Sequence, residues 1–556
     1  MSPILRPRLS HKIMLHPGRV FQLGFALLLA ACGGGGDRAG GTGADAGPPS
    51  PGGTAIMGVS TDFSGLNPVT NSALSTGDVL NYMLFTPLIQ YDKNLQPAPY
   101  LAERWELTDT SVTFFLRNDV TWHDGRPVTA EDVKFTFDVA KQPETASLLA
   151  SAFLNQVKAA TVRDPRTVHF TFEAPHAQAL DGFFWAPVPR HLLSSVGAAG
   201  LAQAPYNQEP VGSGPFRFGS WEKGQRLTLL ANPNFPQALG GRPNLDQVVF
   251  RVIPEATTMT TELMTGTVDA LGFTLQPDQA KQIETQRNVA LNHYPSREFY
   301  YLGWNNTREP FTDARVRRAL AMATNRGQMI EALLQGYGQA AQGMIPPWSP
   351  MYSPTEAVPY NPDAARQLLA EAGWRDTNGD GIIDRNGQPM RFNLLINTGS
   401  TLKADLATVI QRQLREVGVD AQINQVEFQT MLKQHKAREY DAVIANWSLD
   451  NFKVDPTPLF SCAEAQKQGS ANRAGYCNPQ ADQLLQQGLR TTDANQAKQV
   501  WARYNQILQQ DQPVTFLFWS EDLGAVGPRL QNVEMDVRSK LVNVEDWYIP
   551  ENRRRS

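Results

Sequence analysis

The chain has 556 residues, of which 41% are hydrophobic and 19% are charged, and its formal net charge at pH 7 is -4. This length allows two or more lobes with cores of their own. The small net charge and the absence of a basic stripe argue against a nucleic-acid partner, and we interpret the arginines at positions 553–555 as a solvated tail.

The N-terminal segment carries the pattern of an export signal. Basic residues precede an apolar run over residues 21–31, which is too short to span a bilayer. Small residues then lead to Cys32, and a stretch rich in Gly, Ala and Pro continues to about residue 53. This order resembles a bacterial lipoprotein signal, in which the cysteine thiol is acylated and becomes the mature N-terminus. An ordinary signal peptide with an incidental cysteine is the alternative.

The lipoprotein interpretation divides this region into two parts. Residues 1–31 are expected to be a signal peptide, and residues 32–54 a lipidated Cys32 followed by a flexible tether. The rest of the chain is then an exported domain that a lipid anchor holds at the periplasmic or cell-surface side of a bacterial membrane. No other apolar run approaches the length of a transmembrane helix.

Two cysteines, Cys462 and Cys477, remain once Cys32 is assigned to lipid. They lie close in sequence and in an oxidising compartment, so we expect a disulfide. Closing a loop of about 15 residues contributes roughly 3 kcal/mol in the chain-entropy model. A catalytic thiol or a metal pair is the competing interpretation, although neither cysteine has a histidine nearby in the sequence.

Strands and a capped helix are predicted in the first half of the chain. Residues 112–117 alternate like a strand, and Thr129 with Asp132 forms a capping-box pattern ahead of a helix. Residues 167–172 and 226–230 also read as strands. This mixture predicts an α/β or α+β lobe.

The second half predicts a parallel sheet covered by helices. Asn361 caps a helix that Gly373 ends. Three strands then alternate with two helices, at residues 391–397, 419–426 and 441–447. A βαβαβ order of this kind gives parallel strands, whose ligands bind beyond the carboxyl ends. The loops at residues 398–401 and 448–455 occupy that position.

Four long segments, in order, resemble family 5 extracellular solute-binding proteins, the oligopeptide and dipeptide receptors of ABC importers. They are residues 101–138, 211–235, 305–326 and 360–374, and the resemblance runs from about Ala55 to the C-terminus. It implies an α/β, two-lobed periplasmic-binding-protein fold of type II, with an extra subdomain in lobe I and a hinge that closes the cleft. Lobe I is expected at residues 55–304 plus 512–556, and lobe II at residues 305–511.

The resemblance also indicates which residues would bind the two ends of a peptide ligand. Residues 440–462 are similar to a segment of dipeptide-binding proteins whose aspartate pairs with the α-amino group, and that residue is Asp450 here. A role as a helix cap or turn residue is the alternative. The arginine that holds the peptide carboxylate in dipeptide receptors is replaced by Asn397, with Lys403 as the nearest cation in sequence. Asparagine cannot form a bidentate ion pair, which favours longer peptides or another cationic solute over strict dipeptides.

Further ligand contacts follow from position in the family. Tyr301, Trp304 and Trp447 are candidates to face or stack on the solute, with a core role as the alternative, and Ser60 is expected to face the cleft. His123 belongs to a hairpin turn and is not expected to be catalytic. Residues 376–384 follow the spacing of a calcium loop but lack its bidentate glutamate, so an exposed turn is favoured over weak calcium binding.

These observations predict a monomeric receptor that captures dipeptides or oligopeptides and delivers them to an ABC permease and its ATPase subunits. No enzymatic activity, cofactor or metal is expected. A receptor for a non-peptide solute, such as a metal chelate or an opine-like compound, is the alternative. A surface hydrolase is a third possibility, for which the sequence assembles no nucleophile, base and oxyanion site.

Overall fold

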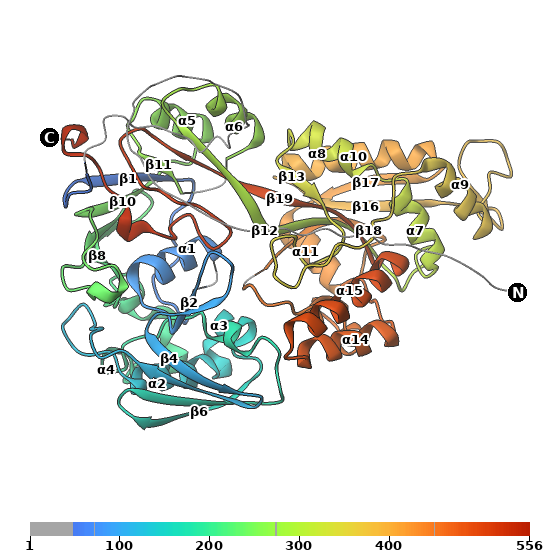
Figure 1. The fold of residues 1–556 in the computed structure, drawn as a ribbon. Coiled ribbons are helices and arrows are strands. Elements are labelled where there is room, and N and C mark those ends of the chain that lie inside the picture. Colours follow the sequence, from blue (N-terminus) through green and yellow to red (C-terminus); the bar gives the residue numbers. More distant parts are fainter. Residues whose placement is uncertain (1–47, 72, 273–274, 450, 556) are drawn as a thin grey trace, which may run out of the picture. The chain divides into compact units, whose positions relative to one another are not determined.

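The computed structural model describes residues 48–71, 73–272, 275–449 and 451–555 (Figure 1). Cys32, the signal peptide before it and Asp450 lie outside the described residues. The chain divides into two units, Met1–Ala44 and Asp45–Ser556, and everything described below belongs to the second. Among the described helices, none has both the length and the apolar character that crossing a membrane requires.

An 11-stranded mixed sheet runs through this unit (Figure 1). In spatial order its path is β17 (Asp420–Val426), β16 (Arg391–Asn397), β18 (Ala442–Ser448), β12 (Ala290–Trp304), β19 (Val514–Val526), β11 (Ala270–Leu271), β1 (Thr54–Val59), β10 (Gln247–Val252), β9 (Arg226–Ala231) and β8 (Phe216–Glu222). The remaining strand, β13 (Gly338–Ala340), pairs with β19. The long antiparallel pair β12 and β19 joins the strands of the first lobe to those of the second.

The extra subdomain of the first lobe is a four-stranded antiparallel sheet. Its order is β4 (Ala102–Thr108), β5 (Ser111–Leu116), β7 (Thr167–Phe172) and β6 (Val157–Asp164). Helix α2 (Ala130–Ala140) begins at Thr129 with the predicted capping box, in which Asp132 Oδ2 accepts from the Thr129 backbone N–H at 2.9 Å. The strands and the helix predicted here are therefore confirmed.

Shorter elements complete the first lobe. They are β2 (Ile89–Tyr91), β3 (Pro97–Pro99), α1 (Leu74–Val79), α3 (Leu148–Ala152), α4 (Arg190–Leu193), α5 (Ala256–Met264) and α6 (Pro277–Glu284).

The second lobe contains the predicted βαβαβ unit. Helix α10 (Thr401–Glu416) connects β16 to β17, helix α11 (Phe428–Ala437) connects β17 to β18, and β16 pairs in parallel with both strands. Gly418, which follows the C-terminal end of α10, has a φ of +83°, and a Cβ there would lie 2.8 Å from the Ile383 side chain. The antiparallel pairing of β18 with β12 was not predicted.

The other elements of the second lobe are mostly helices. They are α7 (Ala314–Met322), α8 (Arg326–Leu333), α9 (Pro362–Glu371), α12 (Thr457–Phe460), α13 (Cys462–Ala465), α14 (Pro479–Arg490), α15 (Ala494–Asp511) and the hairpin strands β14 (Asp384–Arg385) and β15 (Gln388–Pro389). Cys462 and Cys477 form a disulfide, the pairing expected from the sequence.

Separate hydrophobic cores give the two-lobed fold its physical basis. One cluster gathers residues of the first lobe, and two others pack on opposite faces of β12 and its neighbours. Leu302 and Trp304 belong to one of these faces, and Phe299 and Tyr301 to the other, as the alternation of side chains along a strand requires. Strand β12 thus contributes to both cores of the second lobe.

The C-terminal arginines are not the solvated tail that the sequence predicts. Arg554 Nη2 donates to the carbonyl of Ser50 at 2.9 Å and to its Oγ at 2.7 Å. Arg555 Nη2 donates to the carbonyl of Thr267 at 2.8 Å. Arg554 is therefore fixed beside the first described residues of the chain, and Arg555 beside the turn after α5.

Candidate ligand-binding site

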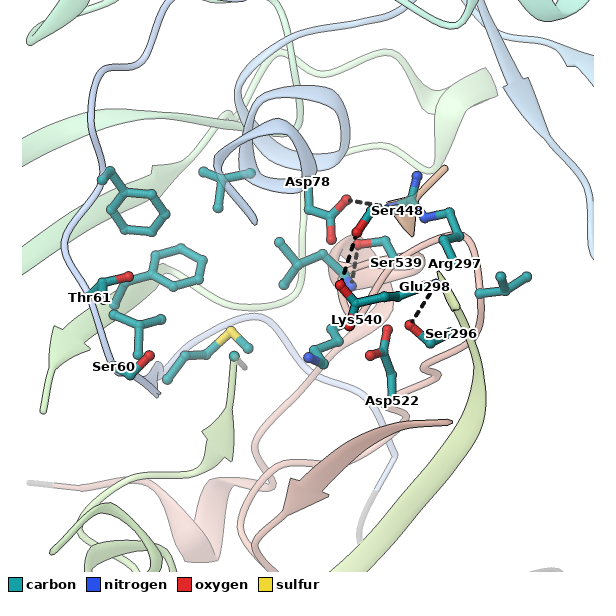
Figure 2. A pocket seen from close by; sticks show the side chains of 18 of the residues that line it. Ser60, Thr61, Asp78, Ser296, Arg297, Glu298, Ser448, Asp522, Ser539 and Lys540 are labelled. Atoms are coloured by element: carbon teal, nitrogen blue, oxygen red, sulfur yellow. Dashed lines mark hydrogen bonds and ion pairs between the residues drawn. The ribbon is translucent and has the colours of Figure 1, made fainter. Parts of the chain in front are cut away.

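A cavity of about 410 Å³ lies along the middle of β12 (Figure 2). Its walls come from the residues after β1, from α1, from the end of β18, and from β19 and the C-terminal segment beyond it. The polar residues labelled in Figure 2 are Ser60, Thr61, Asp78, Ser296, Arg297, Glu298, Ser448, Asp522, Ser539 and Lys540. The cavity therefore has walls from both lobes.

Strand topology explains why polar groups gather at this place. Strand β1 runs parallel to β10 and β11, and Ser60 follows directly after its last residue. Ligands of open α/β sheets bind beyond the carboxyl ends of such strands. Ser60 lines the cavity, which is the position expected for it from the sequence.

An ion pair crosses the cavity wall between α1 and β12. Arg297 Nη2 lies 3.7 Å from Asp78 Oδ1, and the two side chains are only 10% and 24% exposed (Figure 2). Burial raises the pKa of Asp78 to about 6, although Arg297 and Lys540 act in the opposite direction. The carboxylate is thus held in a site where its charge is poorly solvated.

Charges of both signs line the rest of the cavity. Glu298 accepts hydrogen bonds from Asn446 Nδ2 and, at 3.2 Å, from Ser448 Oγ. Burial lowers the pKa of Lys540, while the attraction of Asp522 and Asp78 opposes that shift. Such a cavity offers acceptors for an ammonium group and donors for carbonyl oxygens, with apolar side chains between them.

Tyr301 lines a second, smaller cavity of about 20 Å³, together with His435 and Arg473. This cavity lies on the face of β12 that carries Phe299 and Tyr301. Trp447 is partly buried against the core on this face and lies opposite Phe299 in the register of β18 and β12. Neither aromatic residue lines the larger cavity.

The assignment of Trp304 as a candidate ligand contact is wrong. It is 0% exposed, its Nε1 donates to Thr515 Oγ1 at 3.1 Å, and its ring stacks on Phe311 with centroids 5.0 Å apart. The side chain is therefore a core residue and does not face either cavity. The alternation along β12 places it on the face opposite Tyr301.

Asn397 lies at the end of β16, buried to 7% exposure. Its Oδ1 accepts from Lys403 Nζ at 3.0 Å, and its Nδ2 donates to the carbonyl of Thr398 at 2.8 Å. Lys403 is also 7% exposed. The amide of Asn397 and the ammonium of Lys403 are thus engaged with each other.

Two motifs that looked chemical serve local structure. The carboxylate of Asp376 accepts from the backbone N–H groups of Gly379 at 2.7 Å and Gly381 at 3.0 Å, as an exposed turn requires. Within the described ranges, no three His, Cys, Asp or Glu side chains are placed to hold a metal ion. His123 Nδ1 accepts from the Gly212 N–H at 3.1 Å, and burial lowers the pKa of the imidazole to about 4.

The residues that sequence reasoning missed are Asp78, Arg297, Glu298 and Lys540. None belongs to a recognisable motif, and Arg297 lies 219 positions from its partner Asp78. One signal was present: Arg297 and Glu298 are adjacent charged residues directly before the aromatic run of β12. A charged pair in the middle of a strand that is otherwise largely apolar indicates a polar cavity beside it.

Comparisons with known proteins place this geometry in a family. Residues 96–468 match the model of the bacterial extracellular solute-binding proteins, family 5 middle region. The oligopeptide-binding protein AppA of Bacillus subtilis (strain 168) is 30% identical over 536 residues, which cover 94% of this chain and 96% of AppA. A dipeptide-binding protein of Escherichia coli (strain K12) is 27% identical over 504 residues, or 86% of this chain and 91% of that protein.

The same relationship holds between structures. The solved structure of AppA from Bacillus subtilis in complex with a nonapeptide superposes with a TM-score of 0.75 at 29% sequence identity. The match covers 90% of this chain and 100% of the AppA chain.

Proposed function

Because the chain belongs to the family 5 bacterial extracellular solute-binding proteins, we propose that it is the receptor of an ABC importer that captures peptides and delivers them to the permease and ATPase subunits. The observation that carries this proposal is the charged cavity along β12, whose walls come from both lobes. A ligand there contacts Ser60 and Asp78 of the first lobe and Ser448 of the second. Only the closed form supplies all of these contacts, so the ligand favours closure.

The two ends of the peptide are proposed to be held differently. Asp450 pairs with the α-amino group, and support comes from Ser448, which lies two residues earlier and lines the cavity. A buried ammonium needs such a partner to offset its desolvation. The peptide backbone pairs with polar groups at strand edges, which gives affinity for peptides in general. Trp447 precedes the cavity residue Ser448 on β18 and is proposed to contact a side chain of the peptide that extends beyond the cavity.

The receptor is proposed to be a monomeric lipoprotein without enzymatic activity. Cys32 carries the lipid, residues 32–54 form the tether, and the hinge joins lobe I (residues 55–304 plus 512–556) to lobe II (residues 305–511). The contacts of Arg554 with Ser50 support this arrangement, because they fix the end of the tether to the domain. The ligand is thereby captured close to the membrane that holds the permease.

Co-purification tests the function directly. The exported domain is incubated with a peptide pool, passed through a desalting column, and its bound solutes are identified by mass spectrometry. Intact peptides are the expected result. A bound metal chelate or opine-like compound would identify the non-peptide receptor instead, and cleaved peptides in the flow-through would identify a hydrolase.

A further inference from the structure

The cavity along β12 carries more acidic than basic side chains. Among the described residues that line it, five are acidic and two are basic: Asp62, Asp78, Glu298, Asp522 and Asp536 against Arg297 and Lys540. A cleft lined mainly by one sign of charge focuses its field, and walls of low dielectric strengthen it. The cavity is therefore suited to a ligand that brings positive charge.

Two of the five acids serve the surrounding fold. Asp536 forms a bidentate pair with Arg538, whose Nε donates to Oδ1 at 3.0 Å and whose Nη2 donates to Oδ2 at 2.6 Å. Asp62 accepts from Trp221 Nε1 at 2.9 Å and from the backbone N–H of Gly224 at 2.7 Å. These two carboxylates already have their partners in the protein.

The other three acids face the cavity together with its two cations. Figure 2 shows the carboxyl groups of Asp78, Glu298 and Asp522 on the same side of the space. Arg297 pairs with Asp78, and Lys540 lies close enough to Asp522 and Asp78 for their charges to oppose the lowering of its pKa by burial. Three carboxylates thus share two cations, and the group in excess is that of Glu298.

The hydrogen bonds of Glu298 orient its carboxylate without neutralising the charge. Its donors are the amide of Asn446 and, at 3.2 Å, the hydroxyl of Ser448, which are both neutral. The charge of Glu298 also opposes the lowering of the Lys403 pKa by burial. The Lys403 ammonium, however, donates to Asn397 at 3.0 Å, and this residue is not part of the cavity lining. A cationic ligand can therefore still pair with Glu298.

Asp78 is a second acceptor for such a ligand. Its Oδ1 lies 3.7 Å from Arg297 Nη2, whereas a charge-assisted hydrogen bond measures about 2.7–2.9 Å. Ser539 is hydrogen-bonded to the same carboxyl group. Because a carboxylate has about four lone-pair sites, these two neighbours leave room for a donor from the ligand.

Apolar side chains complete the walls of the cavity. Val59, Val79 and Phe250 are buried and belong to its lining. Lysine and arginine pack their methylene stems on apolar surface of this kind while the charged head reaches polar groups. The volume of about 410 Å³ lies within the usual range of sites for small molecules. A long basic side chain therefore fits the lining better than a small inorganic cation, which would leave the apolar walls uncovered.

We propose that this cavity binds the side chain of a lysine or arginine residue of the peptide, and that Glu298 and Asp78 select it. The inference rests on the proposed function and narrows its ligand to basic peptides. The α-amino group is the other positive group of a peptide, and the proposed function assigns it to Asp450. A basic side chain supplies the second positive charge that the carboxylates of the cavity can pair with.

Matched peptides test this preference. Alanine pentapeptides that carry one Lys, moved in turn through every position, are titrated into the protein by calorimetry. Each is compared with the same peptide carrying ε-N-acetyl-lysine, which keeps the stem and removes the charge. We expect the Lys form to bind about tenfold more tightly or better in at least one position, because its hydrogen bonds to the carboxylates are charge-assisted. All peptides are used with both a free and an acetylated N-terminus.

Three variants locate the effect. Glu298→Gln should remove most of the preference for Lys, because the amide still accepts from Asn446 and Ser448 but carries no charge. Glu298→Asp should keep part of the preference. Glu331→Gln, at an exposed position of α8, is the matched control and should leave it unchanged. Thermal unfolding of each variant shows whether the fold is retained.

The outcomes separate the inference from the proposed function. Equal binding of the Lys and acetyl-lysine peptides in every position overturns the inference and leaves the proposed function intact. Affinity that depends on a free N-terminus and not on the lysine charge assigns the cavity to the α-amino group and overturns it as well. An unchanged preference in Glu298→Gln overturns the role of that residue. If no peptide of any form binds, the proposed function itself fails.

Discussion

The ring of Phe452 lies 4.7 Å from the ring of Tyr91, so a residue that follows β18 in the second lobe packs against the first lobe. Phe452 is 3% exposed and belongs to the hydrophobic core of the first lobe. Two hydrogen bonds flank it: Asn451 Nδ2 donates to the carbonyl of Ala152 at 2.9 Å, and the Val454 N–H donates to Gln178 Oε1 at 2.9 Å. This contact joins the lobes independently of any ligand.

Removal of this ring should weaken the closed form. Truncation of a buried phenylalanine costs about 3–5 kcal/mol in a core. We expect Phe452→Ala to destabilise the closed form relative to the open form by about 2–3 kcal/mol. The loss is smaller than the full cost because water already surrounds this site in the open form. Peptide affinity should fall accordingly, since the competent state is less populated. Calorimetry and small-angle scattering measure both. Phe428→Ala, at a position 45% exposed, is the control. Unchanged affinity and scattering for Phe452→Ala contradict the prediction.

Asp78 should make stability depend on pH. Its pKa is raised from 3.8 to about 6, so between these values the folded protein binds more protons than the unfolded chain. Stability must therefore fall as the pH rises through this window. We expect Asp78→Asn to be more stable than the unmodified protein by up to about 3 kcal/mol at pH 8, with the difference vanishing below pH 4.

Denaturant unfolding of both proteins across this pH range measures the difference. Asp405→Asn, at an exposed position of α10, serves as a control that removes the same charge outside the cavity. A constant difference between Asp78→Asn and the unmodified protein at all pH values would show that Asp78 is ordinarily solvated.

Local signals made parts of the fold predictable. Helix α9 begins at Asn361, whose Oδ1 accepts from the Ala364 N–H at 3.0 Å, and Gly373 follows its end with a φ of +88°. Thr129 and Asp132 likewise form their capping box within four residues of chain. These features depend on neighbours in sequence, which a reader of the sequence sees directly.

The candidate site could be predicted only in part because it depends on distant pairings. Ser60 could be predicted because it directly follows a strand of the first lobe. Asp78 and Arg297 could not, because residues so far apart in sequence meet only in the folded chain. Trp304 looked like its neighbour Tyr301 in sequence, and its burial depends on which face of β12 each residue occupies. Only the pairing of β12 with β18 and β19 decides that question.

Trp304 and Trp447 should respond in opposite ways to the same substitution. Trp304→Phe removes the hydrogen bond to the fully buried Thr515, so we expect a loss of stability of about 1–3 kcal/mol and unchanged peptide affinity. Trp447→Phe should lower peptide affinity more than stability. This side chain is only partly buried, so the fold depends on it less, and it is proposed to contact the peptide. Thermal unfolding and calorimetry on the two variants separate these effects. A loss of affinity without a loss of stability in Trp304→Phe would restore its assignment as a ligand contact.

The disulfide should stabilise the loop that carries Arg473. It closes a loop with a sequence separation of 15, and the chain-entropy model gives a contribution of about 3 kcal/mol. The double variant Cys462→Ser with Cys477→Ser should lose that stability, and denaturant unfolding of this variant and of the unmodified protein measures the difference. Equal free energies of unfolding for the two proteins contradict the prediction.

Asp450 is tested by changing both partners of the proposed ion pair. Asp450→Asn should weaken binding of a peptide with a free amino group by about 3–5 kcal/mol, because an ammonium in a closed cleft is left without its carboxylate. N-acetylation of the peptide should have a similar effect on the unmodified protein. The two changes together should weaken binding hardly more than either alone, since each removes the same interaction. Additive losses would show that Asp450 and the amino group act separately, and the α-amino group would then have to be paired with another carboxylate, of which Glu298 is the first to test by Glu298→Gln.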